Sequence, residues 1–131
     1  MYHPRVQGFD LSDSDCQIRT HVTHIIHGAW QLNFNLRLEG FERVHIAGVR
    51  HLIDLALSSP KAECPRFVFL SSISAVANYR GGDSVPEERM DDISSADLGY
   101  GLSKLTGERL VEVACEKAGL NGAIIRIGQI S

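Results

Sequence analysis

The sequence predicts an α/β fold, in which a parallel sheet is covered by helices. Three short apolar segments alternate with two longer segments of helical periodicity, in the order strand, helix, strand, helix, strand. This alternation is typical of doubly wound sheets, whose helices supply the crossovers between parallel strands. The middle strand is apolar on both faces, as in strands buried between layers. The composition, 44% hydrophobic and 22% charged over 131 residues with a net charge of −3, fits a single domain.

The first half of the chain predicts a strand and a helix after a polar, turn-rich opening. The run HVTHIIHGA, residues His21–Ala29, is short, β-branched and apolar, which favours a buried strand. A helix is expected over about Leu38–Ser58, and the Ser59-Pro60 pair ends it. Spacings of three and four place its apolar residues in one stripe. That stripe comprises Phe41, Val44, Gly48, Leu52, Leu55 and Ala56.

The second half predicts two strands separated by a polar loop and a helix. The strands are RFVFLSS at Arg66–Ser72 and GAIIRIGQI at Gly122–Ile130. After the first of them, Asn78–Ala96 contains glycines and many acidic residues, as in a long surface loop. The helix is expected from about Leu98 to Ala118, with Gly119 as its C-terminal cap. Its apolar stripe comprises Leu102, Leu105, Leu110, Val113 and Ala114.

Composition and charge exclude several classes of function. No run of about 18 apolar residues is present, so no membrane span is expected. The slightly acidic balance, without a block of Lys and Arg, argues against a nucleic-acid or anionic-membrane surface. The start of the chain lacks the pattern of a signal peptide, and a cytoplasmic protein is expected. The three cysteines are far apart, so neither a disulfide framework nor a cysteine-rich metal site is expected.

Three histidines, His21, His24 and His27, recur every third residue and suggest a metal site. In a strand, however, His24 faces away from the other two, and a zinc site needs further ligands that the sequence does not offer. We therefore expect no bound metal. Trp30, which follows shortly after, is expected to be a packing residue. The acidic segment Asp83–Asp97 is expected to be a solvated surface, part of which could border a substrate entrance.

The residues most clearly suited to catalysis are Tyr100 and Lys104. They are four positions apart near the start of the predicted helix, so they lie on one helical face. An ammonium group near a phenol stabilises the phenolate form, which suits Tyr100 to general acid catalysis. A chance pairing with a solvated lysine is the alternative. Ser71 and Ser72 end a buried strand, at the edge where open α/β sheets place their sites, although two serines also suit the start of a loop.

The string YGLSKLTGERL around this pair resembles the extended short-chain dehydrogenases/reductases. The upstream Pro86-Glu87 is similar to the P-E pair that precedes the string in that family. Four residues match the Y-x-x-S-K-x-x-x-E pattern of the family: Tyr100, Ser103, Lys104 and Glu108.

Within that family the sequence resembles the thioester-reductase branch. It is similar in particular to the C-terminal reductase domains of fungal non-ribosomal-peptide-synthetase-like and polyketide enzymes, which are relatives of carboxylic acid reductases. Segment His24–Leu57 carries a pattern close to H-x-A-W followed by N-F-N, and RFVFLSSIS and IIRIGQIS also resemble this branch. The resemblance covers about residues 6 to 131 and implies a Rossmann-like fold.

The resemblance implies a role for each matching residue. Ser72 is expected to hydrogen-bond the substrate carbonyl, Tyr100 to donate the proton, and Lys104 to hold the nicotinamide ribose. The implied cofactor is NADPH, and the implied substrate is an acyl thioester on a carrier, reduced to an aldehyde or an alcohol. Cofactor contacts are expected from Gly28, Ala29, Tyr100, Lys104 and Ile127, the last of which takes the place of a proline in many relatives.

One departure from the family pattern limits these expectations. The family opens with a strand and a glycine-rich turn that binds the pyrophosphate at a helix N-terminus, whereas the sequence contains no G-x-x-G-x-x-G. The basic residues that contact the 2′-phosphate are absent as well. We therefore expect residues 1–131 to form one partial NAD(P)-binding, Rossmann-like domain without its first strands, an internal piece of a larger reductase. The chain alone is expected to bind NADPH weakly or not at all and to be inactive.

Two other interpretations stay open at this point. One is a non-catalytic, truncated remnant of the fold that holds no nucleotide. The other is a different extended short-chain enzyme, such as a nucleotide-sugar epimerase or dehydratase. The H-x-A-W and G-Q-I segments disfavour the second interpretation. A strand and glycine-rich turn encoded directly upstream would favour the reductase over the remnant.

Overall fold

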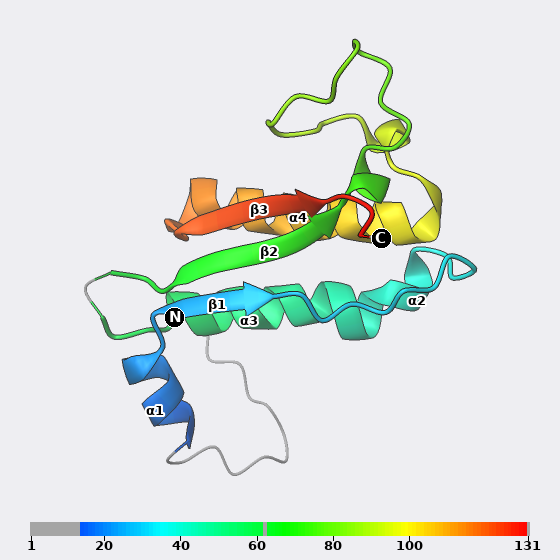
Figure 1. Ribbon diagram of the computed structural model, residues 1–131. Coiled ribbons are helices and arrows are strands. Elements are labelled where there is room, and N and C mark those ends of the chain that lie inside the picture. Colours follow the sequence, from blue (N-terminus) through cyan, green and yellow to red (C-terminus); the bar gives the residue numbers. More distant parts are fainter. Residues whose placement is uncertain (1–13, 62, 131) are drawn as a thin grey trace.

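The computed structural model describes residues 14–61 and 63–130 (Figure 1). Three strands form the sheet: β1 (His24–His27), β2 (Arg66–Ser72) and β3 (Gly122–Ile127). The helices are α1 (Ser14–His21), the continuous segment of α2 (Glu39–Phe41), η1 (Glu42–Ile46) and α3 (Ala47–Leu57), and the long α4 (Leu98–Ala118). Two short 3₁₀ turns, η2 (Ile73–Ala75) and η3 (Ile93–Ser95), lie in the connection between β2 and α4.

The three strands are parallel and lie in the order β1-β2-β3. The register pairs His27 of β1 with Phe69 of β2, and Ser72 of β2 with Ile127 of β3. Because consecutive parallel strands need a crossover, α3 and α4 run back along the sheet between them (Figure 1). This arrangement confirms the predicted α/β fold with a partial, Rossmann-like parallel sheet.

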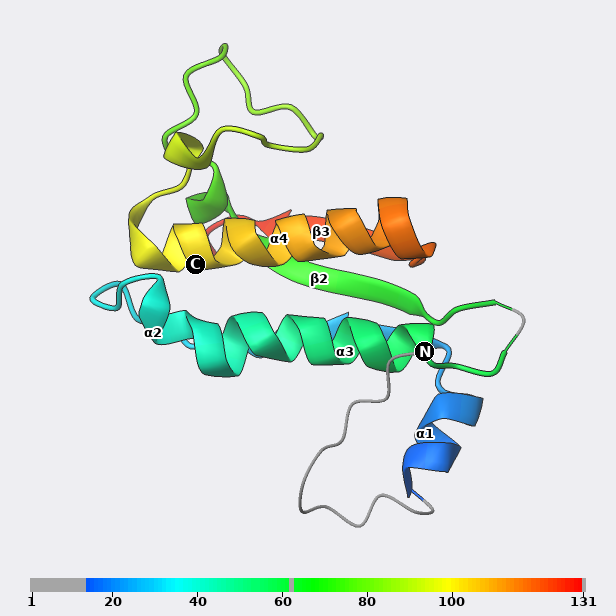
Figure 2. The same cartoon turned by 180° about the vertical axis from the view of Figure 1, so that it is seen from behind.

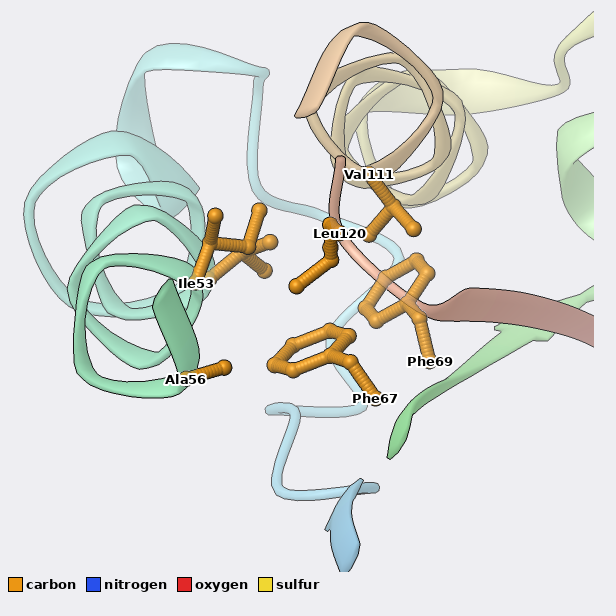
Figure 3. Close-up of a cluster of buried hydrophobic side chains, with 7 residues drawn as sticks. Ile53, Ala56, Phe67, Phe69, Val111 and Leu120 are labelled. Carbon is orange, nitrogen blue, oxygen red and sulfur yellow. The ribbon is translucent and has the colours of Figure 1, made fainter. Parts of the chain in front are cut away.

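Both crossover helices cover the same face of the sheet. Figure 2 shows α3 and α4 in front of the strands, with α4 over β2 and β3. The main core lies between these layers, where Phe67 and Phe69 of β2 are fully buried. They meet Ile53 from α3, Val111 from α4 and Leu120 from the turn after α4 (Figure 3). This core fixes α3 and the later part of α4 against β2. A second cluster, which includes Ala75 of η2 and Leu105 of α4, packs the first half of α4 against the segment after β2.

The other face of the sheet also carries apolar side chains. Val68 and Leu70 alternate with the two core phenylalanines and therefore point to this face. Their neighbours by register include Ile26 of β1, which is 68% exposed, and Ile125 of β3, which is 50% exposed. The both-face apolar pattern of β2 is thus explained by one face against α3 and α4 and a second apolar face that is open in the described residues.

Two elements occupy the residues that the sequence predicts. β2 spans Arg66–Ser72, and α4 spans Leu98–Ala118. Gly119 closes α4 in the left-handed conformation, with a φ of 71°, as expected of a glycine cap.

The other two strands are shorter than predicted. The strand expected over His21–Ala29 begins at His24, because His21 ends α1, whose last turn is closed by a hydrogen bond from Thr20 Oγ1 to the Cys16 carbonyl (2.8 Å). The strand expected to reach Ile130 ends at Ile127, since its partner β2 gives way to η2 after Ser72. The polar opening of the chain lies mostly outside the described residues.

The helical segment after β1 contains a π-helical turn, η1, between α2 and α3. A π turn adds one residue to a regular helix, so it shifts the buried stripe by one position. Phe41, ahead of the turn, is buried as predicted, whereas Val44 is 71% exposed. Beyond the turn the buried residues are Val49, Ile53 and Ala56, of which only Ala56 was predicted. The predicted Gly48, Leu52 and Leu55 are half-buried, and Leu52 packs against the main core as expected.

The buried face of α4 also differs from the predicted apolar stripe, since Val113 is 42% exposed. Small and polar residues occupy much of that face, because the helix lies very close to β2 and η2. A Cβ on Gly107 would lie 2.6 Å from the Phe69 ring. The buried residues of α4 are Gly101, Ser103, Lys104, Leu105, Gly107, Glu108 and Val111. Within the described residues, no helix has the length and apolar character needed to cross a bilayer.

Candidate functional site

The site predicted from the sequence lies where the strands end and α4 begins. Ser72 is the last residue of β2, and η2 follows it directly. The first turn of α4 packs against η2 so closely that a Cβ on Gly101 would lie 2.3 Å from the Ser74 carbonyl oxygen. The Asp97 backbone N–H donates to that same oxygen at 2.8 Å. The two chain segments that carry Ser72 and Tyr100 are therefore joined through Ser74.

Lys104 is deeply buried, with 4% of its surface exposed. Its ammonium group donates a hydrogen bond to the Leu70 carbonyl at 2.7 Å. The same nitrogen lies 4.5 Å from the centre of the Trp30 ring and 5.3 Å from that of Phe69. Burial lowers the pKa of Lys104 to about 8. The predicted lysine is therefore held inside the fold, against the end of β2, rather than solvated on the surface.

Tyr100 lies one helical turn before Lys104 and is half-buried. Phe34, in the loop after β1, meets its ring edge-on with a centroid distance of 5.3 Å. Phe41 of α2 approaches it in the same manner at 6.2 Å. The aromatic residues between β1 and α3 thus form a wall beside the tyrosine ring.

The Ser72 hydroxyl accepts a hydrogen bond from the Ser74 backbone N–H at 3.1 Å. This contact caps η2 and fixes the turn that leads away from the sheet. Ser72 and Lys104 thus both form hydrogen bonds with backbone atoms next to the end of β2. Tyr100 lies on the helix that packs against this end of the strand.

The remaining cofactor positions predicted from the sequence lie at the same edge. Gly28 and Ala29 directly follow β1 and are exposed, and Ile127 is the last residue of β3. A Cβ on Gly28 would lie 3.0 Å from Leu70 Cδ1, so a larger residue there would crowd the neighbouring strand. Because parallel strands end on one side of a sheet, Gly28, Ser72 and Ile127 share this edge.

A buried ion pair behind the site was not predicted from the sequence. Glu108, with 1% exposure, accepts hydrogen bonds from the Ser71 hydroxyl at 2.6 Å and from Arg126 at 2.8 and 3.0 Å. The hydrogen bond to Glu108 raises the pKa of Arg126 above its ordinary value. Arg126 also donates to the backbone carbonyls of Pro86 (3.4 Å) and Glu88 (3.1 Å). The Glu108–Arg126 pair thus connects β2, β3, α4 and the acidic segment Asp83–Asp97.

The acidic segment Asp83–Asp97 was predicted to be solvated, but ion pairs attach it to α4. Arg89 reaches Asp91 at 2.9 Å and Glu116 at 2.8 Å, and Arg109 reaches Asp91 at 2.9 Å. Beside the loop, a groove of about 920 Å³ runs along β3. Its lining includes Ile73, Val85, Pro86, Ile124 and Arg126, and does not include Tyr100 or Lys104.

The three histidines that suggested a metal do not come together. His21 ends α1, His24 points to the open face of the sheet, and His27 lies buried on the covered face beside Phe69. Among residues 14–61 and 63–130, no three His, Cys, Asp or Glu residues are grouped closely enough to hold a metal ion.

Trp30 packs against the main core as predicted, but it also makes a polar contact that was not predicted from the sequence. The Trp30 indole N–H donates to the Ser103 hydroxyl at 3.1 Å, 73 residues further along the chain. Local spacing cannot reveal such a contact, because it depends on how β1 and α4 are brought together by the core.

The sequence of the chain is similar to a family model and to several curated proteins. The chain matches an NAD-binding family model described as Male sterility protein over residues 5–131. It is 42% identical over 115 residues to the adenylate-forming reductase Nps10 of Heterobasidion annosum, covering 88% of this chain and 10% of that protein. It is 36% identical over 134 residues to the carboxylic acid reductase of Neurospora crassa, covering 99% of this chain and 12% of that protein. The chain thus spans about a tenth of the length of these curated relatives.

Among solved structures, the fold is similar to the terminal R domain from the myxalamid PKS-NRPS biosynthetic pathway. The TM-score is 0.78 at 23% sequence identity, and the match covers 92% of this chain and 29% of that chain. This likeness agrees with the partial, Rossmann-like sheet. With the family model matching residues 5–131 and curated reductases more than 35% identical, the chain belongs to the NAD-binding family described as Male sterility protein, in its thioester-reductase branch.

Proposed function

We propose that the protein carrying this chain reduces an acyl thioester, presented on a carrier, to an aldehyde or an alcohol with NADPH. The observation that supports this most directly is the placement of Lys104 and Tyr100, one helical turn apart on α4, beside the end of β2 where Ser72 lies. This edge of a parallel sheet is where open α/β folds bind their ligands.

Each of the three side chains has a distinct task in this proposal. The Ser72 hydroxyl donates a hydrogen bond to the substrate carbonyl oxygen and polarises it. When bound, NADPH would supply the hydride for the carbonyl carbon. Tyr100 donates its phenolic proton to the oxygen as negative charge develops there, which gives a hemithioacetal. When the hemithioacetal collapses, its C–S bond breaks, its hydroxyl proton returns to the Tyr100 phenolate, and the carrier leaves as the thiolate with the aldehyde released. The Lys104 ammonium stabilises the phenolate left behind. With a pKa of about 8, Lys104 is still largely protonated near neutral pH.

The residues present fit the nicotinamide–ribose half of the cofactor. An ammonium group has three donors, and Leu70 occupies one of them, so Lys104 keeps donors for ribose hydroxyls. Gly28 and Ala29 leave the end of β1 open to close approach, and Ile127 lies at the end of β3 on the same edge. Groups for the pyrophosphate and the 2′-phosphate were not found in the sequence, so we expect the chain alone to bind NADPH weakly or not at all and to be inactive.

The relatives support the reaction class. Two of them are named as an adenylate-forming reductase and a carboxylic acid reductase, and the solved structure is a terminal R domain of a PKS-NRPS pathway. We carry the reductase class over from the curated relatives, and we propose a carrier-bound acyl thioester as the substrate.

The experiment that tests this function measures NADPH consumption by the full-length protein with an acyl thioester on a carrier domain or a pantetheine analogue. Tyr100→Phe removes only the proton donor and should lower kcat roughly 10²–10⁴-fold. Tyr79→Phe removes a phenolic hydroxyl elsewhere in the fold and serves as the matched control. A Tyr100→Phe enzyme that turns over at the wild-type rate would overturn the assignment.

A further inference from the structure

Trp30 lies at the centre of the contacts around Lys104. It is the single tryptophan of the chain and follows β1 by three residues. Its ring lies beneath the Lys104 ammonium at 4.5 Å, a distance suited to cation–π attraction. Its indole N–H binds the Ser103 hydroxyl. One side chain from the β1 end of the fold thus contacts two consecutive residues of α4.

The indole is itself held in place by other rings. His27 of β1, His45 of η1 and Phe69 of β2 lie around it, with centroid distances of 6.0, 5.2 and 5.6 Å. These three residues come from three different elements, so the ring orientation depends on the packed core rather than on the local loop. A ring fixed in this way needs no rearrangement when a ligand arrives.

Ser103 extends the contact to Tyr100. Its side chain is fully buried, and its hydroxyl donates to the Tyr100 carbonyl at 2.7 Å while it accepts from Trp30. A chain of two hydrogen bonds therefore runs from the indole to the backbone of the tyrosine.

Lys104 would be poorly defined without the ring. A lysine stem has four rotatable bonds, and the Leu70 carbonyl alone fixes only one direction of the ammonium group. The Trp30 face defines a second direction, so the remaining donor capacity is directed away from both. We propose that Trp30 is a positioning residue for the Tyr100–Lys104 pair: its ring face orients the Lys104 ammonium, and its N–H anchors the first turn of α4 through Ser103. This inference deepens the function proposed above and rests on it for its catalytic consequence.

The charged and titratable groups near Lys104 come from several elements. His27 lies on β1, His45 on η1, and Tyr100 and Glu108 lie one turn away on α4 itself. Burial, and then the charge of Lys104, lower the pKa of His27, so this imidazole is neutral at the pH where Lys104 titrates. The residues of β2 that touch the ammonium, Phe69 and Leu70, carry no charge.

The first experiment uses the single tryptophan as its own reporter in the 131-residue chain. Because the cation lies on the ring face, the Trp30 emission should change with a midpoint near pH 8 as Lys104 loses its proton. Lys104→Met should abolish that step, whereas His51→Asn, at an exposed residue of α3, should keep it. A step that persists in Lys104→Met, or its absence from a folded wild-type chain, would overturn the proposal.

The second experiment measures turnover in the full-length protein. Trp30→Phe keeps a ring but loses the hydrogen bond to Ser103, and Trp30→Leu loses both. A cation–π contact of this kind corresponds to about a 2- to 30-fold change in rate, so kcat should fall by that factor in Trp30→Leu while KM changes little. The alkaline limb of the pH–rate profile should also shift, because the variant changes the surroundings of the Lys104 ammonium. A merely structural defect would leave the profile unchanged.

The two proposals fail in different ways. Wild-type kcat and pH profile in Trp30→Leu, with an inactive Tyr100→Phe, would overturn the role of Trp30 and keep the reductase function. Wild-type turnover in both variants would overturn the function as well. Val44→Ala, at a residue of η1 that is 71% exposed, serves as the control for nonspecific effects.

Discussion

At the scale of single residues, Lys104 shows how this fold keeps a cation away from water. Among residues 14–61 and 63–130, its ammonium has only the Leu70 carbonyl and two aromatic faces as partners. None of these is an anion, so the desolvation of the charge is incompletely offset and the pKa falls to about 8. The chain therefore accepts a cost in stability at the residue that we propose holds the cofactor ribose.

This cost should appear as a pH dependence of stability. The folded pKa of Lys104, about 8, lies below the ordinary value of 10.5, so the unfolded chain binds more protons between these two pH values. Its contribution to the free energy of unfolding should therefore rise as the pH increases from about 8 to 10.5, and be constant below that range. Urea unfolding of wild type and Lys104→Met across this range isolates the contribution. Identical slopes for both proteins would contradict it.

At the scale of elements, the close approach of α4 to the end of β2 and to η2 depends on residues without large side chains. Gly101 allows the first turn to contact the Ser74 carbonyl, and Gly107 allows the middle of the helix to contact the Phe69 ring. Both glycines are unfavourable in a helix, so their presence shows that proximity outweighs helix propensity here.

Two glycine-to-alanine substitutions test this. Gly101→Ala would place a Cβ 2.3 Å from a backbone oxygen and should destabilise the fold by about 1–3 kcal/mol. Gly48→Ala, in α3, has no atom within 4 Å of the added Cβ and should stabilise the fold by about 0.5–1 kcal/mol. Chemical denaturation of the two variants compares them directly. Equal effects would show that the packing of α4 does not require a glycine.

The Glu108–Arg126 ion pair is buried and joins several elements of the fold. Arg126→Met would leave the Glu108 carboxylate buried, with Ser71 as its one remaining side-chain partner in the described part of the chain, and would release the Pro86 and Glu88 carbonyls. We expect a loss of about 3 kcal/mol in the free energy of unfolding. Arg50→Met breaks an exposed ion pair with Asp54 and should cost less than about 0.5 kcal/mol. A cost for Arg126→Met as small as that control would refute the anchoring role.

The sequence predicted elements well where local signals were strong. β2 and α4 have clear composition and, for α4, a glycine cap, and both were located to the residue. α1 was missed because its short polar sequence lacks an apolar stripe. The π turn was missed because its extra residue follows from packing on both sides of it, not from a motif. For the site, spacing pointed to Tyr100 and Lys104, whereas their contacts with Trp30 and Phe34 depend on the tertiary structure.

At the scale of the whole molecule, the described residues form a sheet that is covered on one face. β1 and β3 are its outer strands, and Ile26 and Ile125 are largely exposed on the other face. Outer strands of a parallel sheet with free backbone groups and apolar neighbours are prone to pair with other chains.

The isolated 131-residue chain should therefore self-associate. Sedimentation over a range of concentrations should show species larger than a monomer. Ile26→Lys and Ile125→Lys place charges on the open face and should shift the distribution toward the monomer. A monodisperse wild-type chain with a cooperative melt would show that these surfaces do not cause self-association.

The π turn η1 has a consequence for how this region tolerates changes in length. Successive residues of an α-helix are rotated by about 100°. Removing one residue from Glu42–Ile46, such as the exposed Val44, would restore a regular helix and turn α2 by that angle relative to α3. Phe41, which precedes the deletion, would then leave the ring of Tyr100. Insertions and deletions should thus be accepted in the exposed stretch Gly81–Ser84 of the loop after η2 but not in η1, whose length keeps Phe41 against the Tyr100 ring.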